Sequence, residues 1–310
     1  MSKFSGAVRV VVPATSANLG SGFDSAGLAL SLFDEVEASF TDKPGVQVDV
    51  DGEGRSSLPR DENHLIAKVM LKTFNYLSVP VNGLYIRCIN RIPHGRGLGS
   101  SAAAITAAVV AARALAGTQG TRMDDAGALE LASSVEGHPD NVAACLHGGF
   151  TISWIDSNSL AKAVKLNPHP SIIPVVLIPK FVVDTEQARA LLPTHVPYKD
   201  AAFNLARSAL LVHAICENPD YLLEATSDRI HQEYRRPAMQ SSTALVTDLR
   251  NRNHAAFISG SGPSVCVLTN STKLDEVLSL VPEEFEAQQL RSEEHTSELQ
   301  SRFGISYAVF

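Results

Sequence analysis

The segment PHGRGLGSSAAA, residues 93–104, constrains this chain more than any other, because it places three glycines in alternation directly before a helix-forming run. Glycine tolerates φ > 0 and lets a ligand approach the backbone closely. The free N–H groups and the dipole at a helix start favour an anion such as phosphate. The segment therefore predicts a phosphate cradle. The alternative is a glycine-rich turn whose helix is capped by Ser100 or Ser101.

The spacing separates this loop from two common nucleotide motifs. The P-loop pattern GxxxxGK[ST] is absent, and the GxGxxG spacing of dinucleotide-binding proteins is missing as well. The following helix, predicted over 101–115, is almost pure alanine and valine, and Gly117 can end it. So many small residues predict that another element packs very close to this helix.

Composition and charge narrow the class of function. Apolar residues make up 45% of the 310 residues and charged residues 19%, which predicts a globular protein. A net charge of −7 without a Lys/Arg-rich stretch argues against a nucleic-acid surface. Pro174, Pro179 and Lys180 interrupt the longest apolar stretch, which stays short of the roughly 20 residues of a membrane helix. The four cysteines form no CxxC pair, so we expect a cytoplasmic protein without disulfides or zinc.

Local patterns predict an α+β chain with two halves. In the first half we expect strands at 7–12, 46–50 and 150–154, and helices at 64–77, 101–115 and 124–135. In the second half we expect strands at 174–178, 255–259 and 264–268, and helices at 201–216, 219–229 and 274–280. Glycine and proline punctuation between 137 and 149 places the boundary near 155, which gives domains over 1–155 and 156–290.

Three ordered motifs carry a resemblance to a known superfamily. The string PxxxGLGSSAA within residues 93–104 resembles the second signature of the GHMP kinases, named for galactokinase, homoserine kinase, mevalonate kinase and phosphomevalonate kinase. PATSANLGSGFDSAGLAL at 13–30 and SGSGPSVCVL at 259–268 resemble motifs of the same group. The resemblance implies an ATP-dependent kinase with an N-terminal domain like domain 2 of ribosomal protein S5, a ferredoxin-like C-terminal domain and an active site between them.

Further segments resemble the homoserine kinases in particular. ELASSVEGHPDNVAACLHGGF at 130–150 is similar to their pattern, except that Ala144 stands where proline is common. ARALLP at 188–193 and HQEYRRP at 231–237 resemble the segments that carry substrate-binding arginines. The resemblance implies magnesium-dependent phosphorylation of L-homoserine to O-phospho-L-homoserine in threonine biosynthesis, by a protein that can form a homodimer. The alternatives are a GHMP kinase for another small alcohol such as mevalonate, which the arginine segments disfavour, and a non-catalytic protein of this fold.

The resemblance also implies an ATP and metal site. The expected ATP-binding residues are Asn63 and the loop residues Pro93, Gly95, Arg96, Gly97, Leu98, Gly99, Ser100, Ser101 and Ala102. Ser101 and Glu130 match the magnesium-binding serine and glutamate of the family. Glu136 is a competing carboxylate because it lies nearer the HPDN segment, and capping of the following helix is the alternative role of Asn63.

Homoserine carries an ammonium, a carboxylate and a hydroxyl, so its pocket needs an acceptor, a cation and an orienting polar group. The resemblance implies that Asp24 holds the ammonium and that Arg189 and Arg235 hold the carboxylate by forked hydrogen bonds. Arg236 is the alternative to its neighbour Arg235.

The remaining polar groups of the expected substrate site come from the first half of the chain. They are Asn18, His138 and Asn141. Asp140 aligns with the catalytic aspartate of mevalonate kinases, so Asp140 and Asn141 are the expected catalytic residues. Whether Asp140 acts as a general base stays open, because in-line placement alone can supply about 7–11 kcal/mol of barrier reduction.

The end of the chain has a different character. RSEEHTSELQS at 291–301 resembles the translation of a sequencing-adapter oligonucleotide, and the periodic apolar pattern stops where this string begins. We expect residues 291–310 to be a weakly integrated, non-native tail, with an exposed polar helix as the alternative. A sheet edge would then lack its natural strand, and the segment 303–310 has the propensity to pair there.

Overall fold

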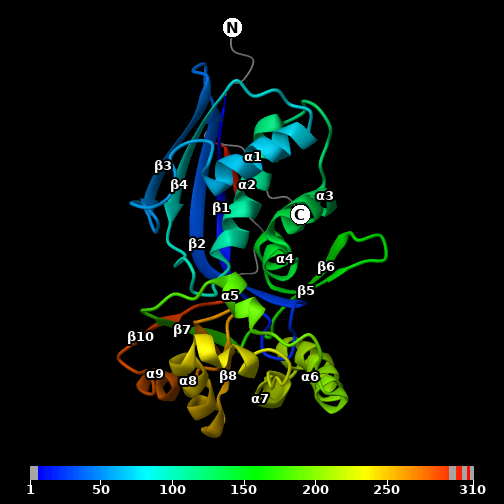
Figure 1. Cartoon of the computed structure of the whole chain (residues 1–310), viewed down its shortest axis with the longest axis vertical. Helices are drawn as coiled ribbons and strands as arrows, with labels where there is room; N and C mark the ends of the chain where they lie inside the picture. The colour runs from blue at the N-terminus through cyan, green and yellow to red at the C-terminus, as the bar shows by residue number, and fades with distance from the viewer. Residues whose placement is uncertain (1–5, 293–297, 302–305, 308–310) are drawn as a thin grey trace.

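The computed structural model describes residues 6–292, 298–301 and 306–307, and it consists of two stacked halves. One half is a large sheet with helices on one side, and the other is a smaller sheet with its own helices (Figure 1). Helix α5 (Thr185–Ala190) lies where the halves meet (Figure 1). The α+β class expected from the sequence is confirmed.

The larger sheet has eight strands. Along the order β12-β11-β1-β2-β4-β3, all pairs are antiparallel except β3 with β4, and β5 pairs with β2 and β6. Its strands are β1 (Ala7–Ala17), β2 (Ala26–Phe40), β3 (Gly45–Gly52), β4 (Gly83–Asn90), β5 (Phe150–Ile155), β6 (Ala161–Leu166), β11 (Glu298–Ser301) and β12 (Ser306–Tyr307). Since β6 pairs with β5, this sheet continues to residue 166, beyond the predicted boundary near 155, and the domain bounds stay a prediction.

Four helices cover this sheet: α1 (Leu65–Tyr76), α2 (Ser100–Ala116), α3 (Asp125–Glu136) and α4 (Asp140–His147). The alanine-rich α2 contacts α1, α3 and α4 as well as strands β1 and β2. Nearly all of its side chains from Ala102 to Ala112 are buried, as expected for a helix that is apolar all round. Small side chains therefore allow the close packing that the sequence predicted.

The smaller sheet is antiparallel, with strand order β10-β7-β9-β8. Its strands are β7 (Ile173–Pro179), β8 (Ala255–Ile258), β9 (Val265–Thr269) and β10 (Phe285–Gln289). Its helices are α5, α6 (Tyr198–Cys216), the short η1 (Pro219–Tyr221), α7 (Leu222–Ala225), η2 (Glu233–Ala238), α8 (Gln240–Asn251) and α9 (Leu274–Ser279). Helices separate β7 from the β8–β9 hairpin and β9 from β10, which is the βαββαβ arrangement of ferredoxin-like domains.

One predicted helix is wrong. The segment 219–229 forms only η1 and α7, and the helical backbone ends at Ala225. The Asp228 carboxylate then accepts hydrogen bonds from the backbone N–H groups of Ile230, His231 and Gln232. Aspartate competes in this way with helix hydrogen bonds, so it stabilises a turn here.

The chain end differs in part from the expectation. The Arg291 carbonyl oxygen accepts from the Ser31 backbone N–H, and the Arg291 N–H donates to Ser31 Oγ. The backbone of β11 pairs with the outer edge of β1. The segment that pairs with β1 thus includes part of the adapter-like string. The sequence had instead favoured residues 303–310 for this pairing. Of these, 303–305 and 308–310 lie outside the described residues. The edge of β1 is covered over Val8–Val11, and the foreign origin of the tail stays a prediction.

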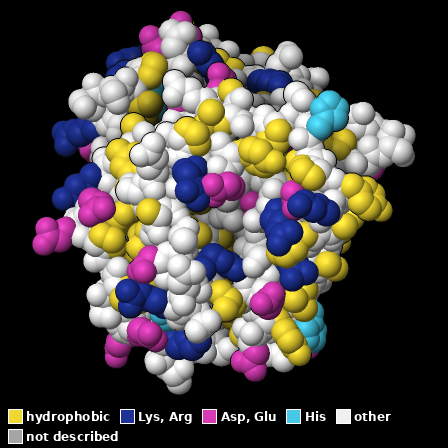
Figure 2. Space-filling view, turned by 60° about the horizontal axis from the view of Figure 1, so that its bottom comes forward, with side chains coloured by type: hydrophobic (Ala, Val, Ile, Leu, Met, Phe, Trp, Pro, Cys, Tyr) yellow, Lys and Arg dark blue, Asp and Glu magenta, His cyan; other side chains and the backbone are white. Residues whose placement is uncertain are grey.

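The surface agrees with the charge pattern of the sequence. On the face drawn in Figure 2, Lys and Arg side chains alternate with Asp and Glu side chains over the surface. Among the described residues, no helix is long and apolar enough to cross a membrane.

Candidate active site

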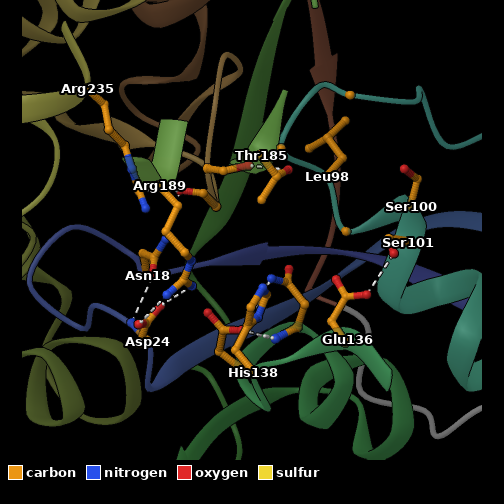
Figure 3. A pocket seen from close by; sticks show the side chains of 17 residues that line it. Asn18, Asp24, Leu98, Ser100, Ser101, Glu136, His138, Thr185, Arg189 and Arg235 are labelled. Carbon is orange, nitrogen blue, oxygen red and sulfur yellow. Dashed lines mark hydrogen bonds and ion pairs between the residues drawn. The ribbon is translucent and has the colours of Figure 1, made fainter. Parts of the chain in front are cut away.

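A cleft between the two halves collects most of the residues expected at the active site. The glycine loop before α2 forms one wall, with Glu136 and His138 beside it, and Asp24, Arg189 and Arg235 form the opposite side (Figure 3). The C-terminal glycine motif adds Gly260 and Ser261.

The glycine loop requires glycine for steric reasons. Gly97 and Gly99 have φ values of 71° and 69°, which L side chains rarely adopt. A Cβ at Gly97 would lie 2.2 Å from the Ser259 carbonyl oxygen, and one at Gly99 would lie 2.0 Å from Thr15 Oγ1. The loop therefore packs directly against both halves, with its backbone exposed to the cleft.

The start of α2 favours the phosphate cradle over the capped turn. The N-cap residue is Gly99, and no side chain caps the helix there, so the predicted cap by Ser100 or Ser101 is wrong. Gly99 has no side chain that could accept from these N–H groups, and both serines are already inside the helix. The first N–H groups of α2 remain available to an anion in the cleft.

Three of the expected ATP-binding loop residues do not line the cleft. The Arg96 guanidinium turns away and donates to the carbonyl oxygens of Pro179 and Phe181, so it ties the loop to the second half. Ala102 is fully buried within α2, and Pro93 lies outside the lining. Gly95, Gly97, Leu98, Gly99, Ser100 and Ser101 do line the cleft.

The carboxylate beside Ser101 is that of Glu136, and the expected Glu130 does not meet Ser101. Ser101 Oγ donates a hydrogen bond of 2.7 Å to Glu136 Oε2 (Figure 3). Glu130 lies on the exposed face of α3 and does not line the cleft. Burial raises the pKa of Glu136, and the hydrogen bond from Ser101 opposes that shift.

A hydrogen-bonded group forms the floor of the cleft. Asp140, which is 2% exposed, lies 2.6 Å from His138 Nδ1 and accepts a 2.8 Å hydrogen bond from the backbone N–H of Asn141. Thr15 Oγ1 donates to Asn141 Oδ1 at 2.7 Å, so the amide is held in one orientation. The hydrogen bond to Asp140 raises the pKa of His138 against the opposing effect of burial.

Asp24 and Arg189 form a forked ion pair across the two halves. Arg189 Nη1 and Nη2 lie 3.1 and 2.9 Å from the two Asp24 oxygens (Figure 3). Asn18 accepts from the backbone N–H of Asp24 at 2.9 Å and donates to the Gly260 carbonyl oxygen at 2.8 Å. Asn18 and Asp24 have φ values of 70° and 52°, a strained geometry that is typical of functional loops.

Arg235 points into the molecule and Arg236 does not. Arg235 is 2% exposed, with Nη1 3.1 Å from His231 Nδ1, and its Nε has no hydrogen-bond partner among the described residues. Burial lowers the pKa of Arg235, and the nearby charge of Arg189 adds to this effect. Arg236 is exposed and pairs with Glu233, so the choice between the two arginines falls on Arg235.

A mainly apolar cavity of about 200 Å³ adjoins the loop, and Ser100 and Ser101 line both spaces. Its walls include Val12, Val36, Leu58, Leu65, Ile66, Ala104 and Ala107. His64 caps α1 by accepting from the Ile66 N–H, and its Nε2 has no hydrogen-bond partner among the described residues. Asn63 does not line this cavity and does not cap the helix. Its neighbour His64 does both.

Comparison with known proteins gives the class first. The family described as "GHMP kinases N terminal domain" matches residues 64–149, and "GHMP kinases C terminal" matches residues 207–287. The fold and the cleft are therefore those of a GHMP kinase. The chain is also similar to the crystal structure of mevalonate kinase, with a TM-score of 0.70 at 17% identity over 93% of this chain and 99% of that one, a likeness of fold alone.

Closer relatives define the family within this class. A homoserine kinase from Streptomyces coelicolor is 53% identical over 284 residues, which covers 92% of this chain and 91% of that protein. One from Clavibacter michiganensis is 49% identical over 84% of this chain and 82% of its own length. The crystal structure of homoserine kinase from Cytophaga hutchinsonii has a TM-score of 0.84 at 25% identity, with 97% and 99% of the two chains covered. The chain belongs to the homoserine kinase family of the GHMP kinases.

Proposed function

We propose that this chain transfers the γ-phosphoryl group of ATP to the side-chain hydroxyl of L-homoserine, giving ADP and O-phospho-L-homoserine for threonine biosynthesis. The observation that carries the proposal is one cleft that joins an uncapped helix start at the glycine loop to a two-arginine, one-aspartate site. The first part suits phosphate and the second suits an amino-acid head group.

The donor nucleotide is proposed to lie along the glycine loop, with its base in the apolar cavity beside α1. The cavity adjoins the loop through Ser100 and Ser101, which is the connection that a nucleoside triphosphate needs. His64 Nδ1 accepts from Ile66 N–H, so in the neutral ring Nε2 carries the proton and can donate to a base nitrogen. His64 takes the role expected for Asn63.

The substrate head group is proposed to bind between Asp24, Arg189 and Arg235. The Asp24–Arg189 pair is about one-third to two-fifths exposed, and such pairs are worth only about 0–1 kcal/mol, so a zwitterion can displace each partner at little cost. The buried Arg235 keeps an unpartnered Nε that a carboxylate can satisfy. The two arginines would hold the carboxylate of homoserine and Asp24 would hold its ammonium. The two cations and one anion of the site therefore match the charges of the substrate.

The hydroxyl is proposed to be held by Asp140 and Asn141. Asp140 Oδ1 already accepts from Asn141 N–H and lies 2.6 Å from His138 Nδ1, so its position is fixed before substrate arrives. In the transfer the homoserine hydroxyl gives its proton to Asp140 or to a phosphate oxygen, and its oxygen forms the new bond to phosphorus while the bond to the ADP oxygen breaks. Positioning of this kind can supply about 7–11 kcal/mol of the barrier reduction.

Ser101 and Glu136 fit a divalent metal that arrives with ATP. Both offer hard oxygen atoms at the start of α2, and Mg²⁺ favours one or two carboxylates together with substrate phosphates. Among the described residues no cluster of three or more His, Cys, Asp or Glu side chains could hold a metal alone, which fits a shared site of this kind. Bound Mg²⁺ would neutralise charge on the phosphate oxygens. The homodimer and the cytoplasmic location expected from the sequence stay predictions.

The decisive experiment is an ADP-release assay of the full chain with homoserine, mevalonate, serine and threonine as acceptors. We expect the highest kcat/KM with homoserine, and O-phospho-L-homoserine as the product by mass spectrometry. A clear preference for mevalonate would move the chain to the alternative small-alcohol kinase. No turnover with any acceptor, from protein that is folded by circular dichroism, would favour the non-catalytic alternative.

A further inference from the structure

A second polar cavity lies in the C-terminal half, apart from the cleft. It has a volume of about 150 Å³ and lies between the start of α7, the turn before β8 and the end of β9. None of its lining residues lines the cleft or the apolar cavity beside α1. Nothing in the proposed phosphoryl transfer uses this space.

The inner end of the cavity has two buried polar side chains without partners. His254 is 2% exposed, and among the described residues neither of its ring nitrogens has a hydrogen-bond partner. Thr269, at the end of β9, is 7% exposed, and its hydroxyl also lacks a partner within the described part of the chain. Buried polar groups are normally hydrogen-bonded, so two such groups in one cavity point to a polar occupant.

The carboxylate of Glu276 lies near the imidazole of His254 but does not satisfy it. Glu276 Oε1 lies 3.6 Å from His254 Nε2, which is longer than a hydrogen bond and leaves Nδ1 untouched. Glu276 itself is exposed and does not line the cavity.

The outer end of the cavity carries one cation and one anion. Lys273 and Asp220 are both exposed and come from different elements, and within the described residues neither takes part in an ion pair. The backbone N–H of Lys273 donates to Asn270 Oδ1, which fixes the turn that presents the ammonium group. The mouth therefore offers opposite charges that are not matched by protein groups.

We propose that this cavity binds a small zwitterion, a free α-amino acid with a polar side chain. Its carboxylate would lie at Lys273, its ammonium at Asp220, and its side-chain hydroxyl or amide at His254 and Thr269. The leucine side chains of the wall, Leu222, Leu223 and Leu268, suit the carbon atoms between these ends. The cavity is smaller than the roughly 300–1,000 Å³ of drug-sized ligand sites, which suits a ligand with few non-hydrogen atoms.

The test is isothermal titration calorimetry of the full chain with L-serine, and with L-alanine as the matched ligand that lacks only the hydroxyl. We expect serine to bind and alanine to bind roughly threefold to tenfold more weakly, the range for one net hydrogen bond. L-lactate and ethanolamine, which each lack one charge of the zwitterion, should bind more weakly than serine. A silent titration with millimolar serine would overturn the proposal.

Variants separate this cavity from the catalytic cleft, which could also accept serine. Thr269→Val keeps the shape of the side chain and Lys273→Met changes an exposed one, so both should fold with an unchanged Tm. Each should weaken serine binding about tenfold, whereas Arg189→Lys in the cleft should leave it unchanged. The reverse pattern would assign the binding to the cleft and refute the proposal. So would a crystal soaked in serine that holds only water beside His254.

Discussion

The two glutamates of α3 offer a matched test of the proposed metal site. Six positions separate Glu130 from Glu136, so at about 100° per residue their side chains point about 120° apart. Only Glu136 meets Ser101, and Glu130 faces solvent. We predict that Glu136→Gln lowers kcat strongly and that Glu130→Gln does not.

The magnitude follows from the environment of each carboxylate. Glutamine at 136 can still accept the hydrogen bond from Ser101, so the loss isolates the negative charge. Removing one preorganised electrostatic contact in an active site typically costs about 10²–10³ in kcat, or roughly 2.7–4 kcal/mol. Glu130 is an exposed side chain, and substitutions of that kind change stability by about 0.5 kcal/mol or less.

Stability should respond in the opposite direction from activity. Because burial raises the pKa of Glu136, the folded protein binds this proton more tightly than the unfolded chain does. The resulting stabilisation is present at low pH and is lost as the pH rises through the raised pKa. At neutral pH the ionised carboxylate of Glu136 therefore lowers the stability of the folded protein. Glu136→Gln should then keep or raise the Tm while activity falls. This split distinguishes lost chemistry from misfolding.

The assay is steady-state kinetics over a magnesium titration for the wild type and both variants, with thermal unfolding in parallel. Glu136→Gln should also need more magnesium for half-maximal rate. Normal turnover and magnesium demand in Glu136→Gln, together with a large loss in Glu130→Gln, would refute the assignment and restore the one expected from the sequence.

Three further predictions concern other parts of the cleft. Arg189→Lys should raise the KM for homoserine roughly 10–100-fold and change the KM for ATP little, because lysine loses the forked geometry; equal losses in steady-state kinetics would place Arg189 at the phosphate instead. His138 has its pKa raised by Asp140, so it stabilises the fold at low pH and less as the pH rises above about 6.5. His138→Gln should flatten that decline in Tm, and an unchanged slope would contradict the role. His64→Ala should raise the KM for ATP and Asn63→Ala should not, and the reverse result would return the base contact to Asn63.

The spacing of apolar residues in the sequence was sufficient to predict the helices and strands that have one apolar face or an apolar run. The helices near 64–77, 101–115 and 124–135 begin and end within one residue of the observed bounds. The long strand β2 was missed because charged residues interrupt its apolar pattern. Their charges are satisfied locally: Asp34 accepts from the backbone N–H groups of Arg91 and Ile92, and Glu35 pairs with Arg9 and Arg91.

Motifs predicted which segments meet at the site, but they did not fix which way each side chain points. The glycine loop, Asp140 and Asn141 come together as the motifs implied, because the cleft is a property of the whole fold. Glu130 matched the family spacing to Asn141 and still faces solvent. The signal that favours Glu136 was present in the sequence, since it is the last helical residue before Gly137 and therefore lies next to the HPDN turn.

We propose that the two arginines of the cleft, Arg189 and Arg235, have different tasks in binding the substrate. Arg189 is two-fifths exposed and already paired with Asp24, so its charge is balanced until a zwitterion replaces both partners. Arg235 is buried beside His231 with an unpartnered Nε, and burial lowers its pKa although the charges of Asp24, Asp228 and Asp140 oppose that shift. In the proposed complex, the substrate carboxylate relieves the cost of burying the Arg235 guanidinium and finds a second donor at Arg189. We therefore propose that the site favours an amino-acid head group over an acceptor without an ammonium, because only the former satisfies the Asp24 that Arg189 releases as well as giving the arginines a carboxylate.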